Sequence, residues 1–329
     1  KDLYGRVAQI LNNARCRQLT SVECCLLIDE AAVTIVAGNI RRSAGMRQFA
    51  SADTAAAGAK ENLWQQDSDG NWRIDPERDA LRMANHTRVF HTRPSLEVVQ
   101  EAVTKQFHSG EGAIQFAPEA IARSNADLLT TAELRQEFQE IYCEQGRQEA
   151  GRWLQLNHPE ITEAELEHRL GRYGLNPCGE ILGADFHCNL AEVHLNRLDP
   201  DDLEGQSDAF RAAGLSVACL LNHRFEVERY RQSRAWDPIV GVSFTGLFDF
   251  FVHAFGTPWL EWWAAGRPET AEGLAFKEQE AAFLARWKTT VNEAVWDYCD
   301  RHGLRRPNRC TTVQPAGTKS LLTGAAPGW

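Results

Sequence analysis

Strand-like and helix-like apolar segments alternate along this chain, with short junctions that contain glycine. An apolar, β-branched stretch at 26–36 leads into a basic loop at 38–43. Apolar residues recur at helical spacing at 96–107 and again at 276–298. A short strand at 310–313 then enters another glycine-containing loop. This alternation favours an α/β fold with parallel strands, because parallel strands need crossover connections and helices usually provide them.

Capping signals predict where several helices begin and end. Ser95 is an expected N-cap, and Gly303 is the expected C-terminal stop of the long helix at 276–298. Two Thr-x-x-Glu boxes, Thr130–Glu133 and Thr162–Glu165, predict two further helix starts. We expect the first of these helices to run as far as 157–159, where a proline stops it.

Composition and charge exclude several classes of protein. With 43% hydrophobic and 24% charged residues, the chain can bury a core and is not expected to be disordered. Its formal charge of −10 argues against binding nucleic acid or an anionic membrane as a main activity. The most apolar window, 239–260, contains Asp249 and His253, and a carboxylate there costs roughly 2.5–3.5 kcal/mol on membrane insertion. We therefore expect buried protein, with no membrane span.

The cysteines point to a reducing compartment. The nine cysteines are an odd set without a CxxC pair or regular spacing. That pattern argues against both a secreted disulfide framework and a structural zinc site. The chain also begins without the features of a signal peptide. A cytoplasmic location is expected, where thiols serve either as core residues or in chemistry.

The segment Asn176-Pro177-Cys178-Gly179-Glu180 has the residues of a reactive centre. Proline and glycine flank the cysteine, so a tight turn is expected to carry the thiol at its tip. The carboxylate two residues later can accept a proton, and the amide two residues earlier can hold a substrate hydroxyl. A neighbouring carboxylate disfavours a thiolate, so the pattern favours chemistry that starts from a neutral thiol rather than a cysteine protease.

Two alternatives remain open for these cysteines. Cys178 and Cys188 could be core thiols beside an ordinary turn, because free cysteine is among the most buried residue types. A metal site could also use Cys178, His187, Cys188 and His194, but that spacing matches no zinc pattern. No metal site is predicted.

Two loops are candidate anion-binding sites. In Pro315–Ser320, a strand runs into a glycine-containing turn with hydroxyls and a lysine, which can present backbone N–H groups to a phosphate. The loop lacks the first glycine of a P-loop. In Gly38–Ser43, two adjacent arginines could pair with a nucleotide phosphate. An ordinary loop and a solvated charged loop are the respective alternatives.

Seven segments in order resemble the catalytic chain of ribonucleotide reductase. The likeness is closest to the adenosylcobalamin-dependent, monomeric ribonucleoside-triphosphate reductases of cyanobacterial type, and it extends over nearly the whole chain. The matching segments are Val36–Ala44, Met83–Thr87, Ser109–Gln115, Asn176–Glu180, Phe186–Leu190, Val242–Gly246 and Pro315–Gly328.

This resemblance implies a fold and an activity. The fold would be part of a ten-stranded α/β barrel, with a central finger loop near 176–188. The activity would be radical-based reduction of ribonucleoside triphosphates to deoxyribonucleotides with adenosylcobalamin. By the same resemblance, Cys178 becomes the thiyl radical that abstracts the ribose 3′ hydrogen. Glu180 takes the 3′-hydroxyl proton, Asn176 orients the sugar, and Cys188 is half of the cysteine pair that supplies two electrons.

The resemblance also implies two nucleotide-binding loops and a reductant. The substrate phosphates would bind a loop made of Pro315, Ala316, Gly317, Thr318, Lys319 and Ser320. A deoxynucleotide effector would act through a loop near 38–44 that includes Gly38, Asn39, Arg41, Arg42 and Ser43. Thioredoxin would reduce the full-length enzyme. Neither nucleic acid nor a membrane is an expected partner.

The chain is expected to be a piece of such an enzyme. It starts at Lys1 without a methionine, and the partner of Cys188 and the tail cysteines of the family have no counterpart in residues 1–329. We therefore expect the central portion of the catalytic barrel, unable to turn over by itself. Two alternatives are the large subunit of a metal-dependent reductase and a nucleotide-binding module that has lost catalysis. The joint presence of Cys178 and Glu180 favours the enzyme.

Overall fold

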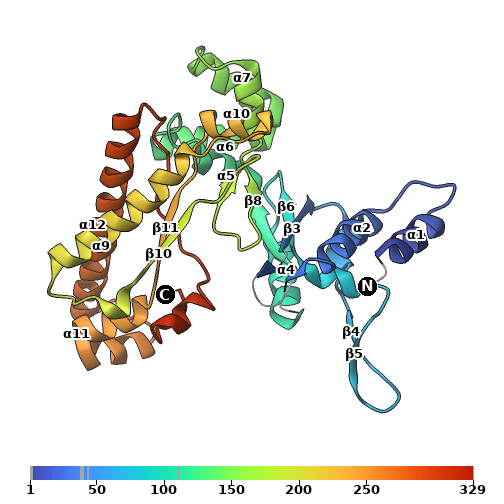
Figure 1. The fold of residues 1–329 in the computed structure, drawn as a ribbon, viewed down its shortest axis with the longest axis horizontal. Helices are drawn as coiled ribbons and strands as arrows, with labels where there is room; N and C mark the ends of the chain where they lie inside the picture. Colours follow the sequence, from blue (N-terminus) through green and yellow to red (C-terminus); the bar gives the residue numbers. More distant parts are fainter. Residues whose placement is uncertain (1–2, 38–40, 43, 110–111, 329) are drawn as a thin grey trace. The chain divides into compact units, whose positions relative to one another are not determined.

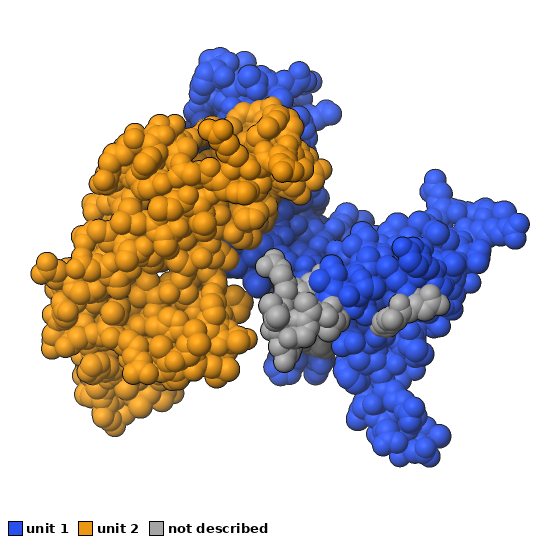
Figure 2. Space-filling view, in the orientation of Figure 1, with its two compact units in different colours: residues 1–182 blue, residues 183–329 orange. Residues whose placement is uncertain are grey.

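The computed structural model describes residues 3–37, 41–42, 44–109 and 112–328. The chain forms two compact units, 1–182 and 183–329, which Figure 2 colours separately. Gly38, Asn39 and Ser43 of the expected effector loop lie outside the described residues. In the described ranges, no helix combines the length and the apolar character needed to cross a membrane.

A parallel sheet forms the centre of the first unit. Its three strands are β3 (Gly45–Ala50), β6 (Ala84–Phe90) and β7 (Ala113–Phe116), with β6 in the middle (Figure 1). The register pairs Gln48 with Thr87, and Val89 with Gln115. Thr87 and Val89 are two residues apart on β6, so both glutamines lie on the same face of the sheet.

Helices and short hairpins complete the first unit. The remaining elements are α1 (Leu3–Asn13), α2 (Ser21–Val33), β1 (Val36–Ala37), β2 (Arg41–Arg42), α3 (Thr54–Gly58), β4 (Trp64–Gln66), β5 (Trp72–Ile74), the 3₁₀ helix η1 (Asp79–Met83), α4 (Leu96–Ser109), α5 (Ala117–Ser124), α6 (Ala132–Gln145), α7 (Arg147–Asn157), α8 (Glu163–Leu170), β8 (Gly174–Leu175) and β9 (Leu182–Gly183), whose second residue is the first of the next unit. Buried apolar residues gather in two clusters, one among α1, α2, Ala59 and η1 and the other among α5 to α8.

The apolar stretch at 26–36, which the sequence indicates only as an element before a basic loop, is helical over most of its length. Residues up to Val33 belong to helix α2, and only Val36–Ala37 is a strand, paired antiparallel with Arg41–Arg42. The helix starts at a capping box in which Thr20 and Glu23 exchange bonds between side chain and backbone. This box lies upstream of the apolar run, and it supplies the helix start that periodicity alone did not indicate.

Helix limits in the first unit follow the capping signals with two corrections. Helix α4 begins directly after Ser95, as predicted, and α8 begins after Thr162, whose hydroxyl accepts from the Glu165 N–H. The cap of α6 is Thr131 instead of Thr130. The helix expected to reach 157–159 is two helices, because Gly146 breaks it with a φ of 90° that L-residues rarely adopt.

The second unit is built on two parallel strands, β10 (Leu190–His194) and β11 (Gly241–Thr245). Helix α9 packs against β10 and against α12 (Figure 1). The predicted strand at 310–313 is reduced to one parallel bridge, between Val242 and Thr311. The other elements of this unit are the 3₁₀ helices η2 (Leu195–Arg197), η3 (Leu220–Asn222) and η4 (Lys319–Leu322) and the helices α9 (Leu203–Cys219), α10 (Glu228–Trp236), α11 (Leu247–Ala264) and α12 (Ala271–His302).

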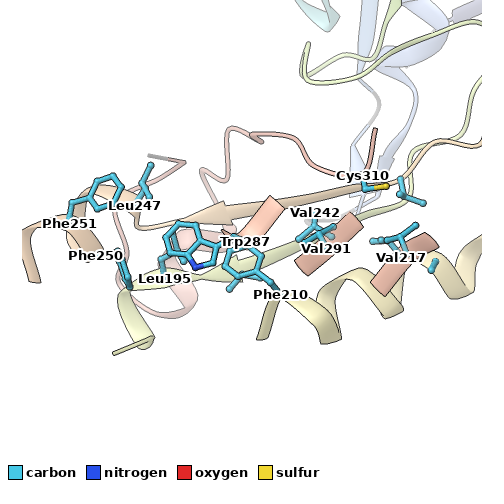
Figure 3. Packing of buried hydrophobic residues seen from close by; sticks show 14 of the residues in the cluster. Leu195, Phe210, Val217, Val242, Leu247, Phe250, Phe251, Trp287, Val291 and Cys310 are labelled. Carbon is cyan, nitrogen blue, oxygen red and sulfur yellow. The ribbon is translucent and has the colours of Figure 1, made fainter. Parts of the chain in front are cut away.

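An aromatic core holds the second unit together (Figure 3). Trp287 of α12 stacks on Phe210 of α9, with ring centroids 5.1 Å apart, and its indole N–H donates to the buried Gln206 at 3.1 Å. Helix α12 confirms the stripe predicted at 276–298, and Gly303 ends it with a φ of 64°. The apolar window at 239–260 is buried protein, as expected, since it forms β11 and most of α11.

The expected α/β class with parallel strands is confirmed in both units. The parallel sheets among the described residues have three and two strands. The ten-stranded barrel implied by the family resemblance is therefore not visible as such in the part of the chain that the structure covers.

Candidate active site

Cys178 occupies the tip of a tight turn. The Gly179 N–H donates to the Asn176 carbonyl at 2.9 Å, which closes a four-residue β-turn with Pro177 and Cys178 in its central positions. Cys178 does not have a positive φ, so the turn is of the common type that accepts Asn first, Pro second and Gly last. The Cys178 side chain is exposed. The alternative in which Cys178 is a core thiol is wrong.

Two asparagines fix this turn. The Asn176 carboxamide oxygen accepts from the Ile181 N–H at 3.0 Å, which closes the base of the loop. Asn85, on β6, donates through its Nδ2 to the Pro177 carbonyl at 2.6 Å. Asn176 is buried, with 8% of its surface exposed. In this state its oxygen supports the turn, and Asn176 is not one of the residues that line the pocket described below.

The turn forms one wall of an open pocket of about 710 Å³ in the first unit. Cys178 and Glu180 line it together with residues of β6, β7 and α5, including Asn85, Gln115 and Arg123. Arg123 is paired with Glu119 of the same helix at 2.6 Å. The volume lies within the usual range for pockets that hold nucleotide-sized ligands. A thiol and a carboxylate thus face one space that such a ligand could fill.

Two glutamines, Gln48 of β3 and Gln115 of β7, support the strand that enters the turn. Both carboxamides bond to the carbonyl of Tyr173, and Gln48 also accepts from the Leu175 N–H. Sequence reasoning missed these residues and Asn85. The signal available was that Asn85 and Gln115 fall within matched segments, 83–87 and 109–115.

His91 and Tyr142 form a small cluster of aromatic rings with Tyr173. The Tyr173 ring meets the His91 imidazole edge-on at 5.4 Å, and the His91 Nδ1 lies 3.0 Å from the Tyr142 hydroxyl. Burial lowers the pKa of His91, and the positive charge of Arg147 lowers it further. Burial raises the pKa of Tyr142 to about 12. At neutral pH both of these groups are therefore uncharged.

The chain is similar in sequence to reductases over nearly its full length. It is 28% identical to the adenosylcobalamin-dependent ribonucleoside-triphosphate reductase of Levilactobacillus brevis, over 99% of this chain and 38% of that protein. It is 27% identical to the protein of the same name from Lacticaseibacillus paracasei, over 97% of this chain and 37% of the relative. The resemblance to adenosylcobalamin-dependent ribonucleotide reductase is confirmed. The chain spans less than two fifths of the length of these relatives.

Solved structures agree with this likeness at the level of the fold. A B12-dependent, class II ribonucleotide reductase matches with a TM-score of 0.61 and 18% identity, over 99% of this chain and 39% of that one. The class Id ribonucleotide reductase alpha subunit of Actinobacillus ureae matches with a TM-score of 0.53 and 9% identity, over 99% of this chain and 59% of that one. Known family models give no match to the chain.

Cys188 is the cysteine to which the reductase resemblance gives a role as electron donor. It lies in the second unit, two residues before β10. Its side chain is half-buried. Beside it, the buried Asn189 donates to the Ile239 carbonyl at 2.9 Å, and its own carbonyl accepts from the Gly241 N–H. These bonds hold the chain next to Cys188 at the start of the β10–β11 pair.

The loop expected to bind the substrate phosphates, 315–320, also belongs to the second unit. Ala316 has a φ of 52°, and its carbonyl accepts from the Ser320 N–H, so the loop is tightly curled. Lys319 forms an ion pair with the buried Glu192 at 2.8 Å and donates to Gln314. Pro315, Gly317, Thr318 and Lys319 are exposed, whereas Ala316 and Ser320 are buried. In this state the lysine is bonded within the protein.

The structure describes only part of the effector loop. Arg41 and Arg42 form β2, while the other effector-loop residues fall outside the described ranges. Among the residues that the structure describes, no group of three or more His, Cys, Asp or Glu side chains could hold a metal ion. The alternative metal site of Cys178, His187, Cys188 and His194 therefore receives no support.

Proposed function

We propose that this chain carries the reaction centre of a radical ribonucleotide reductase, which converts ribonucleoside triphosphates to 2′-deoxyribonucleotides with adenosylcobalamin. The observation that carries the proposal is the exposed Cys178 thiol at the tip of a fixed turn, in one pocket with Glu180. The names of the two curated relatives supply the substrate class and the cofactor.

The surroundings of Cys178 fit a large cofactor that acts on a thiol. Its side chain is exposed on a turn that lines an open pocket, so the sulfur is accessible to a bound group. When bound, adenosylcobalamin supplies the one-electron oxidation that removes the hydrogen atom of a thiol.

Three residues of the turn then have different roles in the reaction of the ribose. As a thiyl radical, Cys178 removes the 3′ hydrogen atom of the ribose and becomes a thiol again. Glu180 accepts the proton of the 3′ hydroxyl, while the 2′ hydroxyl takes a proton from a thiol of the reducing cysteine pair and leaves as water. Glu180 returns its proton to the 3′ oxygen before the hydrogen atom goes back to C3′. Asn176 orients the sugar through its Nδ2 group, since its oxygen is bonded to the Ile181 N–H. At the end Cys178 returns a hydrogen atom to C3′ and is a radical once more.

The two electrons of the reduction come from a pair of thiols. Cys188 is one member, and the other lies outside this chain. The pair is oxidised to a disulfide while the ribonucleotide loses one oxygen as water, so one disulfide forms for each deoxyribonucleotide. In the full-length enzyme thioredoxin then reduces the disulfide.

The nucleotide phosphates bind the 315–320 loop, and a deoxynucleotide effector acts through the loop near 38–44. Lys319 would exchange its contact with Glu192 for a substrate phosphate, since the two anions compete for one ammonium group. The effector loop would couple the two nucleotide sites by about 1–3 kcal/mol, as is typical of allosteric pairs.

Replacement of Cys178 tests the proposal. In the full-length reductase that carries this chain, Cys178→Ser should abolish deoxynucleotide formation, because a serine O–H bond is too strong to yield the radical. Nucleoside triphosphate binding should remain, since serine is nearly isosteric with cysteine. Cys24→Ser is the matched control, because Cys24 is also exposed but lies on α2, away from the pocket. Product formation and nucleotide affinity are both measured.

The outcomes distinguish a radical reductase from the alternative functions. Loss of turnover in Cys178→Ser with normal turnover in Cys24→Ser supports the radical role. Unchanged turnover in Cys178→Ser removes it. If the unsubstituted full-length protein binds the nucleotide but forms no deoxynucleotide with cofactor and dithiol, the chain belongs to a nucleotide-binding module instead.

A further inference from the structure

We infer that Gln48 and Gln115 are positioning residues for Cys178, and that they act by holding strand β8 as a neighbouring strand would. This inference rests on the proposed function, because it assigns a purpose to the placement of the thiol. The two side chains come from the outer strands of the parallel sheet and lie on its same face, with Thr87 and Val89 of β6 between them.

The two carboxamides form a connected network. Gln48 Nε2 donates to Gln115 Oε1 at 2.6 Å and to the Tyr173 carbonyl at 3.0 Å. Gln115 Nε2 donates to the same carbonyl at 2.9 Å. Gln48 Oε1 accepts from the Leu175 N–H at 2.9 Å. The orientation of each amide is fixed by its partners, because a carbonyl needs a facing N–H and the Leu175 N–H needs a facing oxygen.

In this network a side chain makes the hydrogen bonds that a neighbouring strand makes in a β-ladder. In an extended chain, the carbonyl of residue 173 and the N–H of residue 175 point to the same side. A parallel neighbour strand would meet these two groups with the N–H and the carbonyl of one residue, which point to the same side of that strand. The Gln48 carboxamide offers the same two groups. It therefore extends the sheet to β8 at a point where the structure places a side chain instead of a strand.

The held segment leads directly to the reactive turn. Leu175 is followed by Asn176, whose carbonyl and carboxamide oxygens close the turn through Gly179 and Ile181. Closer to the thiol, Asn85 of β6 binds the Pro177 carbonyl. The segment that leads to Cys178 is thus tied to the sheet twice, once through β8 and once through Asn85. Both glutamines are half-buried, so water competes with these bonds less than on an open surface.

Hydrogen-atom transfer explains why such support is needed. The rate depends steeply on the distance between the sulfur and the hydrogen, and a shift of about 1 Å can cost about a hundredfold. Substrate binding depends much less on the position of one thiol. Loosening the turn should therefore lower kcat and leave KM nearly unchanged.

Paired substitutions in the full-length reductase test the inference. Gln48→Met and Gln115→Met keep the side-chain volume and remove the hydrogen bonds. Each should lower kcat about 10- to 100-fold. In Gln48→Met, KM should stay within about threefold of the original, since Gln48 does not line the pocket, whereas Gln115 does. The double variant should be little worse than either single one, because each glutamine holds the other and the effects are not additive. Gln65→Met, on the exposed β4–β5 hairpin, is the matched control and should retain full turnover.

Amide hydrogen exchange separates positioning from general destabilisation. In both variants, exchange should accelerate in residues 173–182, including Gly179, which neither glutamine contacts. Exchange in β6, residues 84–90, should stay as in the unsubstituted protein. Turnover within twofold of the original would overturn the inference. Loss of turnover accompanied by faster exchange throughout β3, β6 and β7 would also overturn it, since that is the signature of a merely structural role.

The same variants test this inference and the proposed function separately. If Cys178→Ser abolishes turnover while both glutamine variants are fully active, the radical role stands and the positioning role fails. If Cys178→Ser remains active, the proposed function itself fails.

Discussion

At the scale of single residues, the placement of Cys178 depends on backbone chemistry more than on side-chain packing. Gly179 ends the turn with a φ of 76°, in the left-handed region that side chains with a Cβ avoid. Apart from Gly179 and its two chain neighbours, no atom lies within 4 Å of the position that a Cβ would take there. The requirement for glycine therefore comes from the local backbone conformation and not from crowding by other parts of the protein.

Replacement of this glycine gives a residue-scale prediction. Gly179→Ala should destabilise the protein by about 1–2 kcal/mol, the cost of a left-handed L-residue, or shift the turn and lower turnover. Gly58→Ala is the control, since Gly58 has no positive φ and its added Cβ would make only ordinary contacts, the nearest at 3.7 Å. Urea unfolding and turnover are measured together. Full stability together with full activity in Gly179→Ala would show that the turn does not need the left-handed conformation.

Some residues of the site could be predicted from sequence and others could not. The turn around Cys178 follows from the adjacent Asn, Pro and Gly, since a β-turn is a local structure. Asn85 and Gln48 act on residues 92 and 125 positions away, and nothing local marks them. The roles of Glu180 and Cys188 come from the family resemblance and stay predictions.

At the scale of elements, local capping signals determine whether a segment is a helix or a strand more strongly than its apolar pattern does. The stretch at 26–36 contains enough β-branched residues for a strand, yet most of it is helix because Thr20 and Glu23 cap α2 upstream. A short apolar run fits either element, so the start signal decides. The break between α6 and α7 at Gly146 was missed because both halves continue the helical spacing.

The α2 capping box leads to a prediction about acid. The bond from Arg17, together with the Thr20 N–H, lowers the pKa of Glu23 to about 2. A lowered pKa in the folded state means that the carboxylate stabilises the fold above its ordinary pKa of 4.5, and that this stabilisation is lost as the pH falls towards 2. Glu23→Gln should therefore lower the urea midpoint at about pH 6, and the difference should shrink below about pH 4.

Arg17→Gln provides the reciprocal variant, because Arg17 contacts Glu23 at 2.6 Å. It should also be less stable than the original at neutral pH and approach it in acid. A difference between the original protein and Glu23→Gln that stays constant from neutral to acid pH would mean that the charge of Glu23 contributes nothing to the helix start.

At the scale of the whole molecule, the chain forms two units with separate cores. The second unit has an aromatic core around Trp287, and the first has two smaller apolar clusters beside its parallel sheet. The α/β class and the parallel strands could be predicted from the alternation of segments. The number of strands could not, because strand pairing is a long-range property and segments such as 310–313 form only a bridge.

The central claim is that the pocket beside Cys178 receives the ribose of a nucleotide. A structure of the full-length protein with a bound ribonucleoside triphosphate tests it most directly. The account predicts the ribose in the pocket lined by Asn85, Cys178 and Glu180, with the Cys178 sulfur about 3.5 Å from C3′ and the Glu180 carboxylate on the 3′ hydroxyl. A nucleotide bound elsewhere, with its ribose remote from Cys178, would contradict it.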